Sequence, residues 1–239
     1  MRNDGRETMI TSIENEKLKL VRRLHRRRRR EQDGLFVTEG EDLVAAGRAA
    51  GREPVELLTA AGEGLGGTEV EPALLDRVSA LGSGTRAIAV WERVWLEERP
   101  SRSAYLHGVS DPGNVGAVIR SAAALADASV CLGPDCADPF SPAAARASMG
   151  AIFTRPPLKG DLDQTPQPRA ALIAEGGGEP AELGGVATIC VGAEREGLPA
   201  AVVEACERQV TIPQSAAVDS LNVAAAAAIA LYLLASGGK

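Results

Sequence analysis

The sequence has few of the features that mark membrane and secreted proteins. Only 3% of its residues are aromatic, and no apolar run reaches the ~18 residues that a membrane span needs. The N-terminus lacks the continuous apolar core of a secretory signal. We therefore expect a cytoplasmic protein with no membrane partner. Met1 and Met9 both remain open as the start of translation.

Cysteine and histidine are also scarce, and neither has the spacing of a metal or redox motif. The two histidines, His25 and His107, are expected to be incidental. The cysteines are expected to be small buried hydrophobic residues, and no metal site is expected. They are Cys131, Cys136, Cys190 and Cys206. The G-x-G-x-x-G pattern of dinucleotide-binding folds and the Walker lysine motif are both absent.

The composition of the sequence is that of a globular protein, and its charges are unevenly distributed. Its 239 residues are 45% hydrophobic and 24% charged, which suits one large domain or two ordinary ones. A chain of this size buries roughly 70% of its unfolded surface, so it needs no disulfide. The net charge of −6 argues against indiscriminate binding of nucleic acid.

One short segment nevertheless concentrates positive charge. Its cations are Lys17, Lys19, Arg22, Arg23, Arg26, Arg27, Arg28, Arg29 and Arg30. Such a run is compatible with a solvated helix face or a flexible arm, and equally with a surface that binds RNA phosphates. The run leads directly into Leu35–Val37, which has the pattern of a buried strand. A basic helix anchored to a sheet favours a positioned RNA contact.

Strands and helices alternate in both halves of the chain, which predicts an α/β fold in two domains. We expect a disordered start over 1–9, a first α/β domain over 10–96 and a charged linker over 97–103. The remaining residues, 104–239, are expected to form a second α/β domain with a parallel sheet.

Ligands of open α/β sheets collect at the carboxyl ends of the strands, and three such ends in the second domain carry unusual residues. The first is 111–121, with a Pro-Gly turn, Asn114 and Arg120. Because Arg120 lies in an otherwise apolar helix, it is either a surface residue or aimed at an anion.

The second strand end is Val191–Leu198, where Gly192 permits close approach to the backbone and Glu194 follows two residues later. The third is Ile212–Val223, a Pro-bounded loop before an alanine-rich helix that Ser220 is expected to cap. Asn222 would lie two residues into that helix, where its amide needs partners.

Together these stretches resemble the SpoU-type RNA ribose 2′-O-methyltransferases of the SPOUT superfamily. The matching positions in the three motifs are Asn114, Gly116 and Arg120; Gly192, Glu194, Gly197 and Leu198; and Ile212, Pro213, Ser220, Leu221, Asn222 and Val223. The Ser-x-Gly-Ala element of the family is similar to 148–151, and 10–40 resembles the start of the L30e-like RNA-binding domain that many members carry.

The resemblance implies S-adenosylmethionine as cofactor, a C-terminal trefoil knot and a homodimer formed through the knotted domain. It places Gly192, Ile212 and Leu221 at the cofactor, together with Glu194, Gly197 and Leu198. It places Asn114, Arg120, Glu194, Ser220 and Asn222 at the reaction site. Arg120 would act as the base, or as a clamp on a neighbouring phosphate, because a guanidinium is normally protonated.

The substrate implied is structured RNA, with ribosomal RNA preferred and transfer RNA as the alternative. Methylation of ribosomal RNA that protects the ribosome against an antibiotic is a variant of the ribosomal RNA interpretation. A non-catalytic RNA-binding or ribosome assembly factor that retains the fold is a further alternative. The family more often has Gly where Ala216 stands, which favours that alternative, whereas the intact set of reaction-site residues opposes it.

Overall fold

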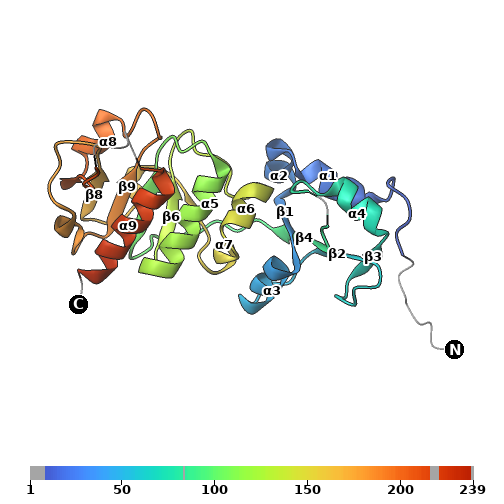
Figure 1. The fold of residues 1–239 in the computed structure, drawn as a ribbon. Helices are drawn as coiled ribbons and strands as arrows, with labels where there is room; N and C mark the ends of the chain where they lie inside the picture. The colour runs from blue at the N-terminus through green and yellow to red at the C-terminus, as the bar shows by residue number, and fades with distance from the viewer. Residues whose placement is uncertain (1–8, 83, 216–220, 238–239) are drawn as a thin grey trace. The chain divides into compact units, whose positions relative to one another are not determined.

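The structure is a computed structural model that describes residues 9–82, 84–215 and 221–237 (Figure 1). The chain divides into two compact units. Unit 1 takes in 1–93 together with 140–153, and unit 2 takes in 94–139 together with 154–239.

Unit 1 is built on a four-stranded mixed sheet in the order β1-β4-β2-β3. β4 pairs antiparallel with β1 and with β2, and β3 pairs parallel with β2. The elements are α1 (Glu16–Leu24), α2 (Arg27–Asp33), β1 (Leu35–Glu39), α3 (Glu41–Ala49), β2 (Glu56–Ala60), β3 (Thr68–Val70), α4 (Pro72–Val78) and β4 (Ala87–Glu92).

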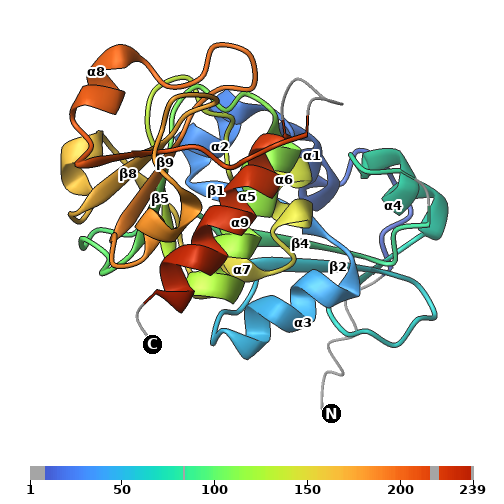
Figure 2. The same cartoon turned by 60° about the vertical axis from the view of Figure 1, so that its left-hand side comes forward.

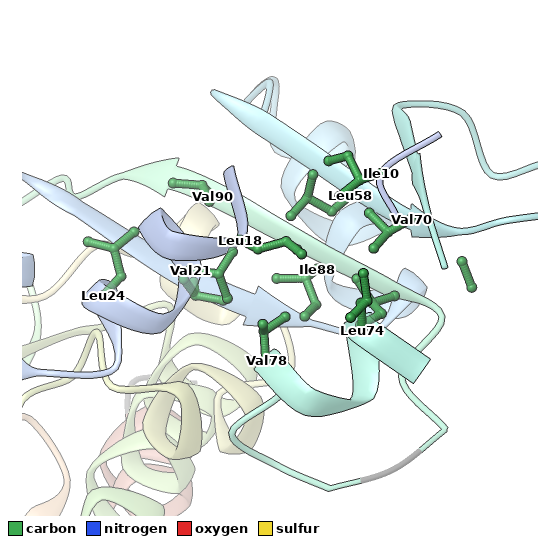
Figure 3. Close-up of a cluster of buried hydrophobic side chains, with 13 residues drawn as sticks. Ile10, Leu18, Val21, Leu24, Leu58, Val70, Leu74, Val78, Ile88 and Val90 are labelled. Atoms are coloured by element: carbon green, nitrogen blue, oxygen red, sulfur yellow. The ribbon is translucent and has the colours of Figure 1, made fainter. Parts of the chain in front are cut away.

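The core of unit 1 forms where α1 covers one face of this sheet (Figure 3). Leu18, Val21 and Leu24 recur every three residues, which puts them on one face of the helix, and all three are buried. They pack with strand residues such as Ile88 and Val90. Each fully buried side chain of this size contributes about 1.5–3 kcal/mol.

Two short helices from the middle of the chain, α6 (Pro142–Ala147) and α7 (Ala151–Thr154), follow Phe140. The Phe140 ring lies 5.1 Å from that of Phe36, and the Phe153 ring lies 4.7 Å from that of Trp91. These aromatic contacts explain why 140–153 cluster with unit 1, whereas the sequence placed them in the second domain. Unit 2 also begins at Val94, ahead of the linker expected over 97–103.

Unit 2 contains a six-stranded sheet in the order β10-β8-β9-β5-β6-β7, and every pairing in it is parallel. This confirms the α/β class and the parallel sheet. The elements are β5 (Ser103–Leu106), α5 (Pro112–Ser121), η1 (Ala122–Ala126), β6 (Ser129–Leu132), β7 (Leu158–Lys159), η2 (Leu162–Gln164), β8 (Arg169–Leu172), η3 (Pro180–Leu183), β9 (Thr188–Val191), α8 (Ala200–Glu204), β10 (Arg208–Val210) and α9 (Val223–Ser236).

The alanine-rich helix α9 runs alongside α5, as Figures 1 and 2 both show. It begins at Val223, two residues later than expected, and Asn222 is its N-cap. The predicted cap Ser220 lies outside the described residues, as does the rest of 216–220. The predicted knot stays a prediction. Among the helices of the described part of the chain, none is long and apolar enough to cross a membrane.

Candidate functional site

A cavity of about 180 Å³ opens at the carboxyl ends of β8, β9 and β10. Its lining residues are Leu172, Ile173, Ala174, Val191, Gly192, Ala193, Glu194, Arg195, Gly197, Ile212, Gln214, Leu221, Val223 and Ala226. We call this the strand-end cavity. Ligands of parallel sheets bind at such a position, because the strand ends leave a crevice there.

Two glycines shape the loop that forms one wall of this cavity. A Cβ on Gly192 would lie 2.1 Å from the backbone carbon of Gly197, so no other residue fits at 192 without moving the loop. Gly197 has a φ of +67°, which disfavours a side chain there. The glycines of the second motif are therefore required by close approach and by backbone conformation, respectively.

Beside the cavity, the three predicted motifs meet in a chain of hydrogen bonds. Asn114 Nδ2 donates to Glu194 Oε1 at 2.7 Å, and Asn222 Nδ2 donates to Asn114 Oδ1 at 3.0 Å. The three residues are far apart in sequence and come from α5, from the loop after β9 and from the start of α9. The structure therefore brings together three of the five predicted reaction-site residues.

Helix capping fixes two members of this cluster. Asp111 caps α5 and accepts a hydrogen bond from the Asn114 N–H at 2.7 Å, with Pro112 as the first helical residue. Asn222 Oδ1 accepts from the N–H groups of Ala224 and Ala225 at the start of α9. Asn222 therefore lies at the cap and not inside the helix, and this satisfies the amide that the sequence left without partners.

The predicted cofactor residues Gly192, Ile212, Leu221, Glu194 and Gly197 all line the strand-end cavity. Leu198 does not line it. Its side chain packs instead against the cluster of Tyr105, Cys131 and Cys190 below the loop. The predicted contact of Leu198 with the cofactor therefore stays a prediction.

The lining suits the cofactor that the resemblance implies. Leu172, Ile173, Val191 and Val223 offer apolar walls for a flat purine ring. Glu194 brings a carboxylate to the same cavity, which is the charge that a sulfonium cation would favour.

A second cavity of about 670 Å³ shares the wall formed by Ala193, Glu194, Arg195 and Gly197. Its other lining residues are His107, Gly108, Ser110, Asp111, Asp135, Glu196 and Pro199. The sequence did not single out His107 as functional, although it directly follows β5 and the same strand-end rule would have found it. His107 Nδ1 lies 3.4 Å from the Tyr105 hydroxyl, and burial raises the pKa of Tyr105 to about 12.

Arg120 is not brought to this cluster. It is exposed on α5, and neither cavity has it among the described residues that line it. Six residues separate it from Asn114, which is 240° around a helix with 3.6 residues per turn, so the two side chains leave α5 in different directions. Its role at the reacting atoms stays a proposal.

In unit 1 the basic segment divides into three groups. Arg30 is 3% exposed and donates to the carbonyl oxygens of Leu24 and His25 at the end of α1. Its predicted place on an RNA-binding surface is wrong, since the C-terminal carbonyls of α1 hold the guanidinium inside.

Four further cations pair with carboxylates of unit 1. The pairs are Lys17–Glu56 at 3.1 Å, Lys19–Glu16 at 3.0 Å, Arg23–Asp33 at 3.0 Å and Arg27–Glu31 at 3.1 Å. Arg29 donates to Gln32. The side chains of Arg22, Arg26 and Arg28 are exposed and make no hydrogen bond or ion pair with the described residues. They are the cations that remain available to an anionic partner.

Comparison with known proteins follows the same division of the chain. Residues 102–232 match the model of the SpoU rRNA Methylase family, and residues 15–96 match that of the MRM3-like substrate binding domain. A curated protein of Synechocystis sp., named an uncharacterized tRNA/rRNA methyltransferase, is 30% identical over 93% of this chain and 92% of its own length.

Several solved structures cover nearly the whole chain. The crystal structure of an RNA 2′-O ribose methyltransferase is 31% identical, with a TM-score of 0.82 over 97% of this chain and 99% of its own. An AdoMet-bound rRNA methyltransferase from Sinorhizobium meliloti also has a TM-score of 0.82, at 24% identity, and covers 95% of this chain and 97% of its own. At 24% identity, the likeness to the S. meliloti structure shows a shared fold.

Proposed function

The chain belongs to the SpoU rRNA Methylase family, and we propose that it transfers a methyl group from S-adenosylmethionine to a ribose 2′-hydroxyl of structured RNA. The observation that carries the proposal is the hydrogen-bonded cluster of Asn114, Glu194 and Asn222 beside the strand-end cavity. Ribosomal RNA is the preferred substrate, since the description of the family names it. The 31%-identical structure is named for ribose 2′-O methylation.

When bound, S-adenosylmethionine supplies a methyl group on a positively charged sulfur. Ile212, Leu221 and the apolar residues around them would hold the purine and keep water from the site. Glu194 would stabilise the positive charge, and Asn114, held by Glu194 and Asn222, would orient the ribose. Alignment of this kind supplies much of the rate of a transfer whose charges disappear in the transition state.

The 2′-hydroxyl must also lose a proton, and Arg120 is our candidate for assisting that step. A guanidinium loses its own proton only far above neutral pH, which favours a clamp on the adjacent phosphate over a base. As a clamp it would stabilise the developing negative charge on oxygen. The exposed position of Arg120 on α5 leaves it accessible to RNA.

The RNA contact is proposed for unit 1, through Arg22, Arg26 and Arg28. These guanidiniums are exposed and have no carboxylate partner in the described part of the chain, so binding a phosphate breaks no ion pair there. Cations already paired would have to leave Glu31 or Asp33 first. The match of 15–96 to a substrate binding domain supports the assignment.

We also propose that unit 2 forms a homodimer and that the enzyme works in the cytoplasm. α9 exposes Ile229 (40%) and Tyr232 (60%), large apolar groups that a second copy would cover. Sedimentation velocity tests the dimer, and a monomer at micromolar concentration would contradict it.

Transfer RNA remains the second candidate substrate, since the Synechocystis relative is named for both RNAs. A binding or assembly factor without catalysis is separated from an enzyme by calorimetry with S-adenosylmethionine. We expect the wild-type protein to bind S-adenosylmethionine saturably and Gly192→Val to abolish that binding. A wild-type protein that does not bind S-adenosylmethionine would contradict the proposal. Mapping of 2′-O-methyl marks in ribosomal and transfer RNA of a deletion strain then identifies the substrate.

A further inference from the structure

Two thiols are in contact beneath the loop that carries Glu194. Cys206 Sγ lies 3.6 Å from Cys190 Sγ and 3.2 Å from the Val202 carbonyl oxygen, and donates toward both. Cys190 is fully buried in β9, and Cys206 follows α8 and is partly exposed. The pair therefore combines one thiol that small solutes reach with a second directly behind it.

The other two cysteines of unit 2 are arranged differently. Cys131 donates to the Gly160 carbonyl oxygen at 3.6 Å, and Cys136 donates to the Leu106 carbonyl oxygen at 3.3 Å. Both are buried and have backbone partners of their own. They provide an internal control for any chemistry that depends on contact between sulfurs.

The contact also divides the roles of the two sulfurs. The hydrogen bond between the two sulfurs lowers the pKa of Cys206, while the same hydrogen bond and burial raise the pKa of Cys190. Cys206 is then both the more acidic and the more accessible thiol, and the thiolate is the form that reacts with oxidants.

We propose that Cys190 and Cys206 form a thiol-oxidation site that closes reversibly into an intrachain disulfide when the protein meets hydrogen peroxide. The Cys206 thiolate attacks one peroxide oxygen, the O–O bond breaks, and hydroxide leaves and takes up a proton to form water. Cys190 then attacks the sulfur of the resulting sulfenic acid. The S–O bond breaks, and the departing hydroxide takes the Cys190 proton. Two thiols and one peroxide thus give one disulfide and two waters.

The geometry requires a modest movement. The sulfurs must approach from 3.6 Å to about 2.05 Å, the length of a disulfide bond. β9 lies inside the sheet between β8 and β5, whereas α8 has no buried residue, so the end of α8 is the part that moves. Transient, redox-sensing disulfides of this kind are the ones that occur in reducing compartments.

The bond would close 190–206 into a covalent loop that contains both glycines of the cavity wall. Because Gly192 and Gly197 are already in close contact, pulling α8 toward β9 disturbs their packing. Resting on the proposed function, we infer that oxidation weakens the binding of S-adenosylmethionine.

The test oxidises the full chain with hydrogen peroxide, blocks free thiols with N-ethylmaleimide and maps disulfides by mass spectrometry. We expect one linkage, Cys190 to Cys206, which dithiothreitol reverses, which Cys136→Ser retains and which Cys206→Ser abolishes. Stable sulfinic acid at Cys206 without a linkage, or a linkage to another cysteine or another chain, would overturn the proposal.

Calorimetry on the same samples measures the consequence for the cofactor. We expect a dissociation constant for S-adenosylmethionine that rises several-fold on oxidation and returns with dithiothreitol, with no change in Cys206→Ser. A dissociation constant for S-adenosylmethionine that is the same before and after oxidation would overturn the inference that oxidation weakens cofactor binding. If neither form binds, the proposed function fails while the disulfide, detected without reference to activity, stands.

Discussion

The side-chain amide of Asn114 joins the two other motifs: it donates to Glu194 at 2.7 Å and accepts from Asn222 at 3.0 Å. The two asparagines differ in what else they do. Asn222 also caps α9 through two backbone N–H groups, whereas the Asn114 side chain makes no hydrogen bond with the residues of its own helix that the structure describes. Substituting each asparagine in turn therefore distinguishes an effect on catalysis from an effect on the stability of the fold.

Asn114→Ala and Asn222→Ala should therefore have unequal effects. We expect both to slow methyl transfer by about a hundredfold, the scale of losing a preorganised polar group. Only Asn222→Ala should lower the free energy of unfolding appreciably, by about 1 kcal/mol, because it loses the cap. Denaturant titration and single-turnover kinetics measure the two quantities. Equal destabilisation by both variants would contradict the capping role.

Binding of RNA should depend on the unpaired arginines of unit 1. For Arg26→Gln combined with Arg28→Gln, we expect weaker RNA binding and a slope of log K against log salt that is shallower by roughly 1.5. Binding of S-adenosylmethionine should not change. The matched control is Arg48→Gln, since Arg48 is exposed in the same unit but pairs with Glu53. If the double variant has the same salt slope of RNA binding as the wild type, these arginines are solvated surface residues and do not bind RNA.

Arg30 should behave as a structural residue. Arg30→Met keeps an unbranched side chain of similar length but removes the hydrogen bonds to the carbonyls of Leu24 and His25. We expect a loss of about 2 kcal/mol or more in the free energy of unfolding, since buried charged groups make strong hydrogen bonds. Arg28→Met, at an exposed position, should change it by less than about 0.5 kcal/mol. Indistinguishable stabilities would show that Arg30 is not held as described.

The sequence predicted most of the site and less of its surroundings. It identified Asn114, Glu194 and Asn222 because their types and spacing matched a family pattern. It could not foresee that Arg30 turns inward, because a run of five arginines gives no signal of which one meets the carbonyls at a helix end. The packing of Phe140 and Phe153 with unit 1 was equally invisible, since it depends on tertiary contacts with Phe36 and Trp91.

Stability should depend on pH through His25. Burial lowers the pKa of His25 from its usual 6.5, and Nε2 has no hydrogen-bond partner among the described residues. As pH falls through about 6.5, the unfolded chain takes up the proton before the folded one does, so stability decreases. We expect the unfolding free energy to drop between pH 7.5 and 5.5, and to drop less in His25→Asn. Parallel pH profiles for the two proteins would exclude His25 as the source.

The most direct measurement is to incubate the protein with ribosomal RNA and S-adenosylmethionine carrying a labelled methyl group, digest the RNA and identify the labelled nucleoside. The account predicts label on a ribose 2′-oxygen, and a loss of about a hundredfold or more in Arg120→Ala with cofactor binding retained. Label on a base, or no transfer to any RNA by a protein that binds the cofactor, would contradict it.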